Sequence, residues 1–340
     1  MTKKKTRKKL KIAVLLSGNL RTFEQTAPYL KKYLLDRYNS DVFIHAPSKI
    51  DHDRQAWHNV INKNKPISSL AIREELLTKA TKLYQPKKII INDSENNINI
   101  SGVWNVWHGK NNNYKIPLTG CYRMFYHWRE INKLWQNHAK KNNIKYDFIV
   151  FIRPDVMLLE PMILETYQDF FDFNQKTIVF LSGMQSIFEG ATGFYLTNFC
   201  IDRIIFAKPP AMKTFLNIFH HFDRYFKKAH RLPFPPRINS SFENQQILYA
   251  AEQNLLPLCG KINHILKRMN KKDDQILIFP DRAKHSNHKM TKTMYYKFIK
   301  KEIMQFIASH KRFISRIYLM SPYINKPYRL FKKIIGLKIN

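Results

Sequence analysis

The stretch YDFIVFIRPDV, residues 146–156, decides the fold class because it joins a buried strand to a polar ending. Residues 146–153 are predicted as a strand, because their mostly apolar residues are typical of a strand covered on both faces of a parallel sheet. The run ends in Arg153, Pro154 and Asp155. Ligands of open α/β sheets bind at the carboxyl ends of the strands, so this ending predicts a binding site.

Strand-like and helix-like segments alternate through the first half of the chain, which predicts an α/β fold with a mostly parallel sheet and helices on both faces. Apolar runs predict strands at 11–18, 41–45, 87–91 and 146–153, and later at 177–182, 193–197 and 203–207. Helical spacing predicts a helix that starts around Thr26 and Pro28, and others at 69–84, 121–139, 209–222, 242–253 and 291–310. The polar, Asn-rich residues 96–117 are interpreted as a long loop.

The composition fits a large folded domain with basic ends. The chain has 340 residues, 44% of them apolar, and a formal charge of +33. Basic residues crowd the first eleven positions, and after Lys284 the only acid is Glu302. Such ends suggest an anionic partner, either a membrane surface or nucleic acid, and the membrane is favoured.

Cysteine usage and hydropathy indicate the cell compartment. The three cysteines lie far apart and form no CxxC pair, which fits the reducing cytoplasm. No apolar run reaches the roughly 18–20 residues of a membrane span. We therefore expect a cytoplasmic protein that is soluble or rests on a membrane.

Two groups of polar residues follow predicted strands and form the candidate phosphate site. Ser17 and Gly18 allow a tight turn after the first strand, and Arg21 adds a cation suited to a phosphate or carboxylate. This segment is equally compatible with an ordinary surface turn. Asp155 is a natural oxygen ligand for Mg²⁺ or Mn²⁺, and Arg153 could pair either with Asp155 or with a substrate.

Acids later in the chain are candidates for a second role. Glu189 and Gly190 lie in a loop between strands, and Asp202 precedes a strand. Glu243 stands at the start of a helix, where it could act as a general base or simply cap the helix. His285 could be a further metal ligand, although a solvated histidine explains it as well.

Four blocks of sequence resemble bacterial glycosyltransferases of the GT-A fold that serve lipopolysaccharide and capsule assembly. The resemblance covers roughly residues 11 to 260, and its second block is the most specific. The blocks are KIAVLLSGNLRTFE, CYRMFYHWREINKLWQNHAKKNNIKYDFIVFIRPDV, DRIIFAKPPAMKTF and FENQQILYAAEQN.

The resemblance implies a Rossmann-like GT-A domain at 11–285, with a nucleotide-sugar half at about 11–160 and an acceptor half at about 161–285. A basic arm at 1–10 precedes this domain, and a basic amphipathic helical tail at 286–340 follows it. By similarity, Asp155 corresponds to the metal-binding acid of the fold, with Mn²⁺ or Mg²⁺ as the expected ion. The second acid of that motif is missing, because Val156 and Met157 follow Asp155.

The implied reaction transfers a sugar from a nucleotide-sugar donor to a lipid-linked or oligosaccharide acceptor. Ser17, Gly18, Arg21 and Arg153 would bind the donor phosphates, while Glu189, Gly190 and Asp202 would lie on the acceptor side. Glu243 is the first choice for a base if the enzyme inverts the sugar configuration. The sequence leaves inversion or retention open.

The basic ends would hold such an enzyme on the inner face of an anionic membrane, at about 1 kcal/mol for each basic residue near the surface. Two alternatives remain, a basic nucleic-acid-binding protein and a non-catalytic glycan-binding relative. Nucleic acid is not expected, because the charge gathers at the two ends and no zinc-finger spacing or RNA-binding signature is present.

Overall fold

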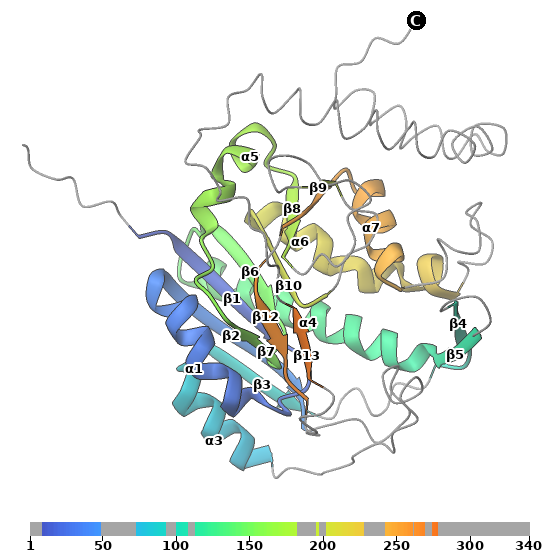
Figure 1. Cartoon of the computed structure of the whole chain (residues 1–340), viewed down its shortest axis with the longest axis horizontal. Coiled ribbons are helices and arrows are strands. Elements are labelled where there is room, and N and C mark those ends of the chain that lie inside the picture. The colour runs from blue at the N-terminus through green and yellow to red at the C-terminus, as the bar shows by residue number, and fades with distance from the viewer. Residues whose placement is uncertain are drawn as a thin grey trace, which may run out of the picture.

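A computed structural model describes the chain over residues 9–48, 73–92, 100–107, 113–181, 195–196, 202–227, 242–260, 262–268 and 274–277. Its central feature is an eight-stranded sheet with the order β3-β2-β1-β6-β10-β8-β11-β9 (Figure 1). The strands are β1 (Lys11–Ser17), β2 (Asn39–Pro47), β3 (Lys88–Asn92), β6 (Phe148–Ile152), β8 (Thr177–Phe180), β9 (Tyr195–Leu196), β10 (Ile204–Ala207) and β11 (Leu256–Cys259).

The direction of the strands makes the sheet mixed but mostly parallel. Neighbours β3, β2, β1 and β6 are parallel to one another. β10 runs antiparallel to both β6 and β8, while β11 is parallel to β8 and antiparallel to β9. The chain proceeds from β1 outward to β3 on one side, and β6 then pairs with β1 on the other. The strand order therefore reverses between β1 and β6, which is where open α/β sheets bind ligands.

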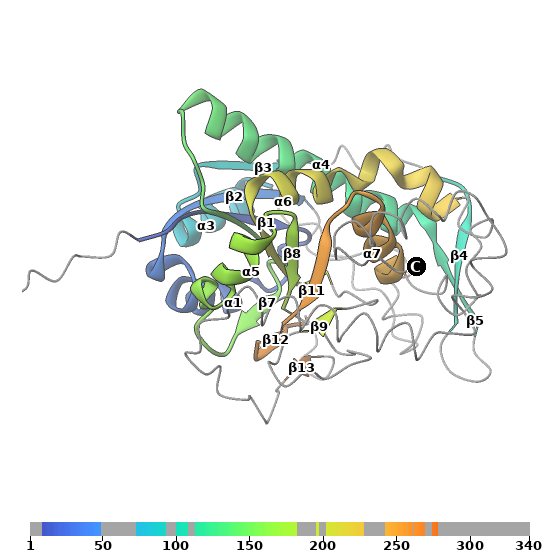
Figure 2. The ribbon, with the colours of Figure 1, turned by 90° about the horizontal axis from the view of Figure 1, so that it is seen from above.

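Helices cover both faces of this sheet. Figure 2 shows α4 (Leu118–Lys141) and α6 (Pro209–Leu216) above the sheet, and α1 (Phe23–Tyr33) and α5 (Gln168–Phe173) below it. The remaining helices are α3 (Arg73–Tyr84) and α7 (Phe242–Glu252), and single helical turns lie at Leu35–Arg37, Leu164–Tyr167, Asn217–His221 and Asp223–Lys227.

Successive side chains of a strand point to opposite faces of the main sheet, and helices cover both faces, so both faces are apolar. On β6, Phe151 contacts Trp128 of α4, whereas Phe148 contacts Phe171 of α5. Trp128 is 1% exposed and also packs on Phe215 of α6. A strand of this kind needs large apolar residues at every position, and this is why FIVFI is buried throughout.

Two smaller sheets accompany the main one. Strands β7 (Val156–Leu158), β12 (His264–Leu266) and β13 (Gln275–Leu277) form an antiparallel sheet in the order β13-β12-β7. Strands β4 (Val103–Trp107) and β5 (Asn113–Pro117) form a hairpin. The first of these small sheets begins directly after Asp155 and thereby touches the candidate site.

The α/β class and the mostly parallel sheet are confirmed, and every predicted strand lies in the main sheet. The predicted loop at 96–117 is wrong, because its β-branched and aromatic residues pair as β4 and β5. The predicted helix start around Thr26 and Pro28 is also wrong, since α1 begins at Phe23 and contains Pro28. The predicted helix at 291–310 and the basic tail lie outside the described residues.

Besides β4 and β5, four short strands were not expected from the sequence, namely β7, β11, β12 and β13. Each is only three or four residues long, too short for an alternating pattern to show. Within the described residues, no helix is both long enough and apolar enough to cross a membrane.

Candidate functional site

The candidate site lies at the carboxyl ends of β1 and β6, beside the reversal of strand order. β1 ends at Ser17, and the chain turns at Gly18, whose φ of +119° is one that residues with a side chain rarely adopt. The backbone N–H of Gly18 donates to the carbonyl of His45 at the end of β2, over 3.4 Å. This turn leads the chain back over the sheet edge and brings Arg21 to the end of β6.

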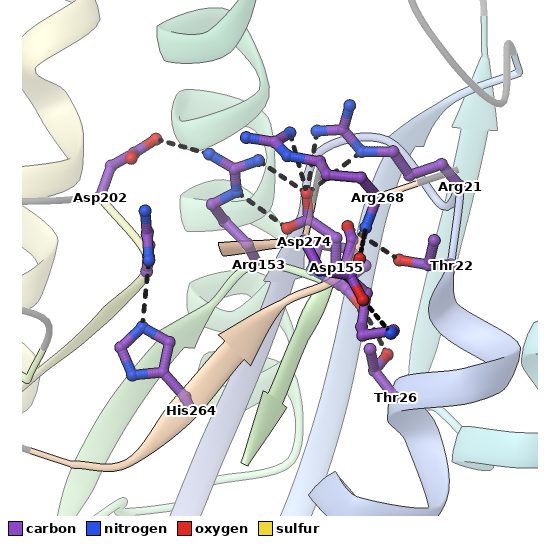
Figure 3. A network of polar contacts seen from close by, with 12 residues as sticks. Arg21, Thr22, Thr26, Arg153, Asp155, Asp202, His264, Arg268 and Asp274 are labelled. Atoms are coloured by element: carbon purple, nitrogen blue, oxygen red, sulfur yellow. Dashed lines mark hydrogen bonds and ion pairs between the residues drawn. The ribbon is translucent and has the colours of Figure 1, made fainter. Parts of the chain in front are cut away.

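Asp155 is the centre of the site. Its side chain is 2% exposed, and its Oδ2 accepts hydrogen bonds from Nε of Arg21 at 3.1 Å and from Nη2 of Arg21 at 2.8 Å. Arg153 donates from Nε to Oδ1 at 3.0 Å and from Nη2 to Oδ2 at 2.7 Å. Nη1 of Arg268 approaches Oδ2 to 3.8 Å. Figure 3 shows the three guanidinium groups pointing toward this carboxylate, and we call Arg21, Arg153 and Arg268 the arginine cluster.

The small sheet explains how Arg268, more than a hundred residues downstream, reaches Asp155. Leu266 of β12 pairs with Val156 of β7, so the next backbone N–H, that of Lys267, donates to the carbonyl of Asp155 at 2.8 Å. The backbone N–H of Arg268 then donates to the carboxylate of Asp274 at 2.7 Å. Both ends of this short segment are fixed, and the Arg268 side chain lies over Asp155.

The start of α1 fixes the other side of the loop that carries Asp155. The hydroxyl of Thr26 donates to the carbonyl of Pro154 at 2.5 Å. The hydroxyl of Thr22 donates to the carbonyl of Lys267 at 3.5 Å. Segments from the beginning, middle and end of the described chain thus meet at one carboxylate.

A second acid lies beside the cluster. Oδ2 of Asp202 is 3.6 Å from Nη1 of Arg153, and its side chain is 8% exposed. The adjacent Arg203 is 5% exposed and lies 3.5 Å from Nε2 of His264. Nδ1 of His264 lies 2.8 Å from the carbonyl oxygen of Ile262, which can only accept, so Nδ1 carries the proton and Nε2 faces Arg203 as an acceptor.

Positive charge gathers around Asp155. The three guanidinium groups of the arginine cluster face two carboxylates, those of Asp155 and Asp202. Burial alone would raise the pKa of Asp155, but the guanidinium groups of Arg153, Arg21 and Arg268 outweigh it and hold that pKa well below its usual range. Burial, together with the positive charges of Arg21 and Arg153, lowers the pKa of Arg268 to about 9. The positive charge around Asp155 therefore favours its ionised carboxylate and makes the Arg268 guanidinium easier to deprotonate than a free arginine.

Two polar groups at the site lack hydrogen-bond partners within the described part of the chain. The hydroxyl of Ser17 is buried, and its residue is 3% exposed. The guanidinium of Arg268, with its side chain 10% exposed, comes no nearer than 3.8 Å to an acid. Buried polar groups are normally satisfied, so the unmet Ser17 hydroxyl, near three guanidinium groups, indicates a place for a polar, anionic ligand.

The predicted site residues divide into three sets. Ser17, Gly18, Arg21, Arg153, Asp155 and Asp202 come together around the reversal of strand order. Glu243 is the second residue of α7, as expected for a helix start. Glu189, Gly190 and His285 lie outside the described residues.

Sequence reasoning missed Arg268, Arg203 and His264. Arg268 follows a three-residue strand in a chain rich in Lys and Arg, so nothing in its neighbourhood marks it. Arg203 directly follows the candidate Asp202, and its place at the carboxyl end of β6 arises because β10 is antiparallel to β6. The sequence does not show that β10 is antiparallel to β6, and without that knowledge Arg203 could not be placed at the site.

The expected divalent cation can be tested against the donors around Asp155. Both of its carboxylate oxygens already accept hydrogen bonds from arginines, and three guanidinium groups lie within 4 Å. Among the residues that the structure describes, no group of three or more His, Cys, Asp or Glu is arranged to hold a metal ion. As arranged here, the residues around Asp155 do not fit Mg²⁺ or Mn²⁺, which need free carboxylate oxygens.

The fold and site define an α/β protein with a cluster of arginines around a buried carboxylate at the reversal of its strand order. Residues 7–171 match the model of a domain of unknown function (DUF7796), a little under half of the chain. That segment includes Arg21, Arg153 and Asp155 but not Asp202 or Arg268. A comparison with curated proteins found no match.

Proposed function

We propose that this chain is a glycosyltransferase of the GT-A type, which moves a sugar from a nucleotide-sugar donor to a lipid-linked or polysaccharide acceptor in cell-surface glycan assembly. The observation that carries the proposal is the arginine cluster at the carboxyl ends of β1 and β6, where Arg21 and Arg153 bind Asp155 and Arg268 approaches it. Nucleotides bind at this part of the sheet in doubly wound α/β folds.

The chemistry of sugar transfer supports assigning the cluster to the donor. As the bond between the anomeric carbon and the diphosphate breaks, its electron pair stays on the diphosphate oxygen. Guanidinium groups fixed in advance beside that oxygen stabilise the growing negative charge. Arg21 and Arg153 are fixed in this way by their hydrogen bonds to Asp155.

The acceptor hydroxyl forms the new bond to the anomeric carbon and must lose its proton. We assign that proton to Glu243, at the start of α7, where the helix dipole favours the ionised carboxylate. Glu243→Gln should leave donor binding unchanged and lower the transfer rate by about 100-fold or more, within the range of general-base catalysis. An unchanged rate would remove Glu243 from this role.

A thermal-shift screen with UDP-, GDP-, CMP- and dTDP-sugars tests the proposal. A donor at about 100 times its dissociation constant stabilises the folded state by about 2.7 kcal/mol, so one of the four series should raise the melting temperature. Arg21→Gln should abolish that rise. No shift with any series would refute the donor site, and binding without sugar transfer would instead indicate a non-catalytic glycan-binding relative.

We further propose that the protein acts at the cytoplasmic face of an anionic membrane. The support comes from the sequence of its ends, where Lys332, Lys333 and Lys338 alternate with apolar residues. Flotation with vesicles containing anionic lipid should recover the full chain, and replacing the three lysines with glutamine should reduce recovery. Equal recovery of both proteins, or tight binding to DNA instead, would contradict this assignment.

A further inference from the structure

We propose that the arginine cluster binds a diphosphate group directly, without a divalent cation, and that Asp155 orients the three guanidinium groups instead of ligating a metal. The inference rests on the proposed function in taking the diphosphate to be that of a nucleotide sugar. It goes beyond that function because the same transfer reaction is compatible with a metal-held diphosphate.

The first argument is the use of Asp155. Four guanidinium N–H groups, two from Arg21 and two from Arg153, already donate to its two oxygens over 2.7–3.1 Å. Oδ2 accepts three of these bonds and Oδ1 accepts one, so a divalent cation bound to both oxygens would have to displace an arginine, and at either oxygen it would lie beside positive charges. Asp202 is not a free second ligand for such a cation, because its own carboxylate is 3.6 Å from Arg153.

The second argument is the unmet hydrogen-bonding capacity of Arg268. Among the described residues its guanidinium donates no hydrogen bond, although nine-tenths of the side chain is buried and Figure 3 shows it pointing toward the other two arginines. A guanidinium has five N–H donors in a plane, and that geometry matches two oxygens of a phosphate group. The buried hydroxyl of Ser17, at the end of β1, adds one more unpaired donor at this edge of the sheet.

The third argument is charge. Arg21, Arg153 and Arg268 each bring a guanidinium group to within 4 Å of the Asp155 carboxylate. A divalent cation bound at that carboxylate would therefore lie among like charges, whereas a diphosphate beside the arginine cluster would lie among opposite charges.

Inorganic pyrophosphate is the probe that separates the two possibilities, because it carries the diphosphate without a base or a sugar. The melting temperature and calorimetric affinity of the full chain would be measured with pyrophosphate in EDTA, and again with excess Mg²⁺. We expect binding in EDTA and weaker binding with Mg²⁺, because Mg²⁺ competes for the same oxygens. Binding that appears only when Mg²⁺ or Mn²⁺ is present would overturn the inference.

Matched variants show whether the binding is at the cluster. Arg268→Gln should weaken pyrophosphate binding by about 10- to 100-fold, the loss expected for one or two charge-assisted hydrogen bonds. Arg268→Lys keeps the charge but not the planar donors, so it should recover only part of the affinity. The control is Arg129→Gln on α4, which removes one positive charge outside the arginine cluster, at an arginine that pairs with Glu130. Equal losses in Arg129→Gln and Arg268→Gln would mean that pyrophosphate binds only to the general positive charge of the protein.

The results distinguish this inference from the proposed function. Nucleotide sugars that bind only with Mn²⁺ would refute the metal-free site and leave the transferase proposal standing. Pyrophosphate that binds in EDTA, with no nucleotide sugar binding under any condition, would support the anion site and refute the transferase. Sulfate at equal ionic strength should give a smaller shift, and an equal shift would count against a diphosphate site.

Discussion

Replacing Asp155 with asparagine keeps the shape of the side chain and removes the charge that the arginine cluster surrounds. The carboxylate is 2% exposed and accepts four hydrogen bonds from Arg21 and Arg153. An asparagine amide nitrogen is a donor, so it would face guanidinium donors at one of the two oxygen positions. Removing one partner of a buried ion pair costs about 3–5 kcal/mol.

Urea denaturation measures this loss directly, and Asp36→Asn supplies the control. Asp36 also forms an ion pair, with Lys31 at 2.5 Å, but its side chain is 54% exposed, so its loss should cost less than about 1 kcal/mol. For a folded unit of this size, the Asp155→Asn loss corresponds to a melting temperature lower by roughly 6–20 °C. If Asp155→Asn cost no more than Asp36→Asn, Asp155 would not be the residue that organises the cluster.

The double variant Asp155→Asn with Arg268→Gln tests whether Arg268 becomes destabilising once the Asp155 charge is removed. Arg268 makes no hydrogen bond to Asp155 and interacts with it only through charge at 3.8 Å. Once the carboxylate is gone, Arg268 only repels Arg21 and Arg153, so the double variant should be more stable than Asp155→Asn alone. A double variant that is less stable than the single one would refute the charge argument.

Three further predictions follow from buried groups elsewhere. Burial lowers the pKa of His45 from 6.5 to about 3 and that of His264 to about 4, so both side chains stay neutral in the folded protein and take up protons on unfolding. The free energy of unfolding should therefore be highest above pH 6.5 and fall by about 2 kcal/mol per histidine by pH 5. Urea denaturation at both pH values measures this difference. Gly18→Ala should cost about 1 kcal/mol through its φ of +119° alone, because the nearest side-chain atom, on Pro154, is 3.8 Å from the added carbon; a cost near zero would mean that the turn relaxes. Trp128→Ala should cost about 3–5 kcal/mol in the same assay, and an unchanged urea midpoint would place the core elsewhere.

The sequence predicted the half of the site that local patterns encode. The run at 146–153 marks β6 as a buried strand, and its polar ending places Arg153 and Asp155 at the carboxyl end. The turn at Ser17 and Gly18 does the same for β1. Because adjacent parallel strands end at the same edge, Arg21 and Asp155 could be expected near each other without a structure.

The other half of the site depends on pairing that no local pattern reveals. Arg268 arrives through the pairing of Val156 with Leu266, two strands of three residues each. Asp202 arrives because β10 reverses direction beside β6, which the alternation of apolar residues cannot show. The hairpin of β4 and β5 was missed for a related reason, since the asparagines in that segment suggested a loop.

The role of Asp155 shows how these distant residues change the chemistry expected from a motif. A lone carboxylate at the end of a strand predicts a metal ligand when only its neighbours in sequence are considered. Arg21 and Arg153 lie within the segment that matches the domain of unknown function and already occupy both oxygens. Arg268, from outside that segment, adds a third guanidinium group 3.8 Å from the same carboxylate. The anionic ligand that we propose therefore depends on Arg21 and Arg268, which reach this carboxylate only after the chain has folded.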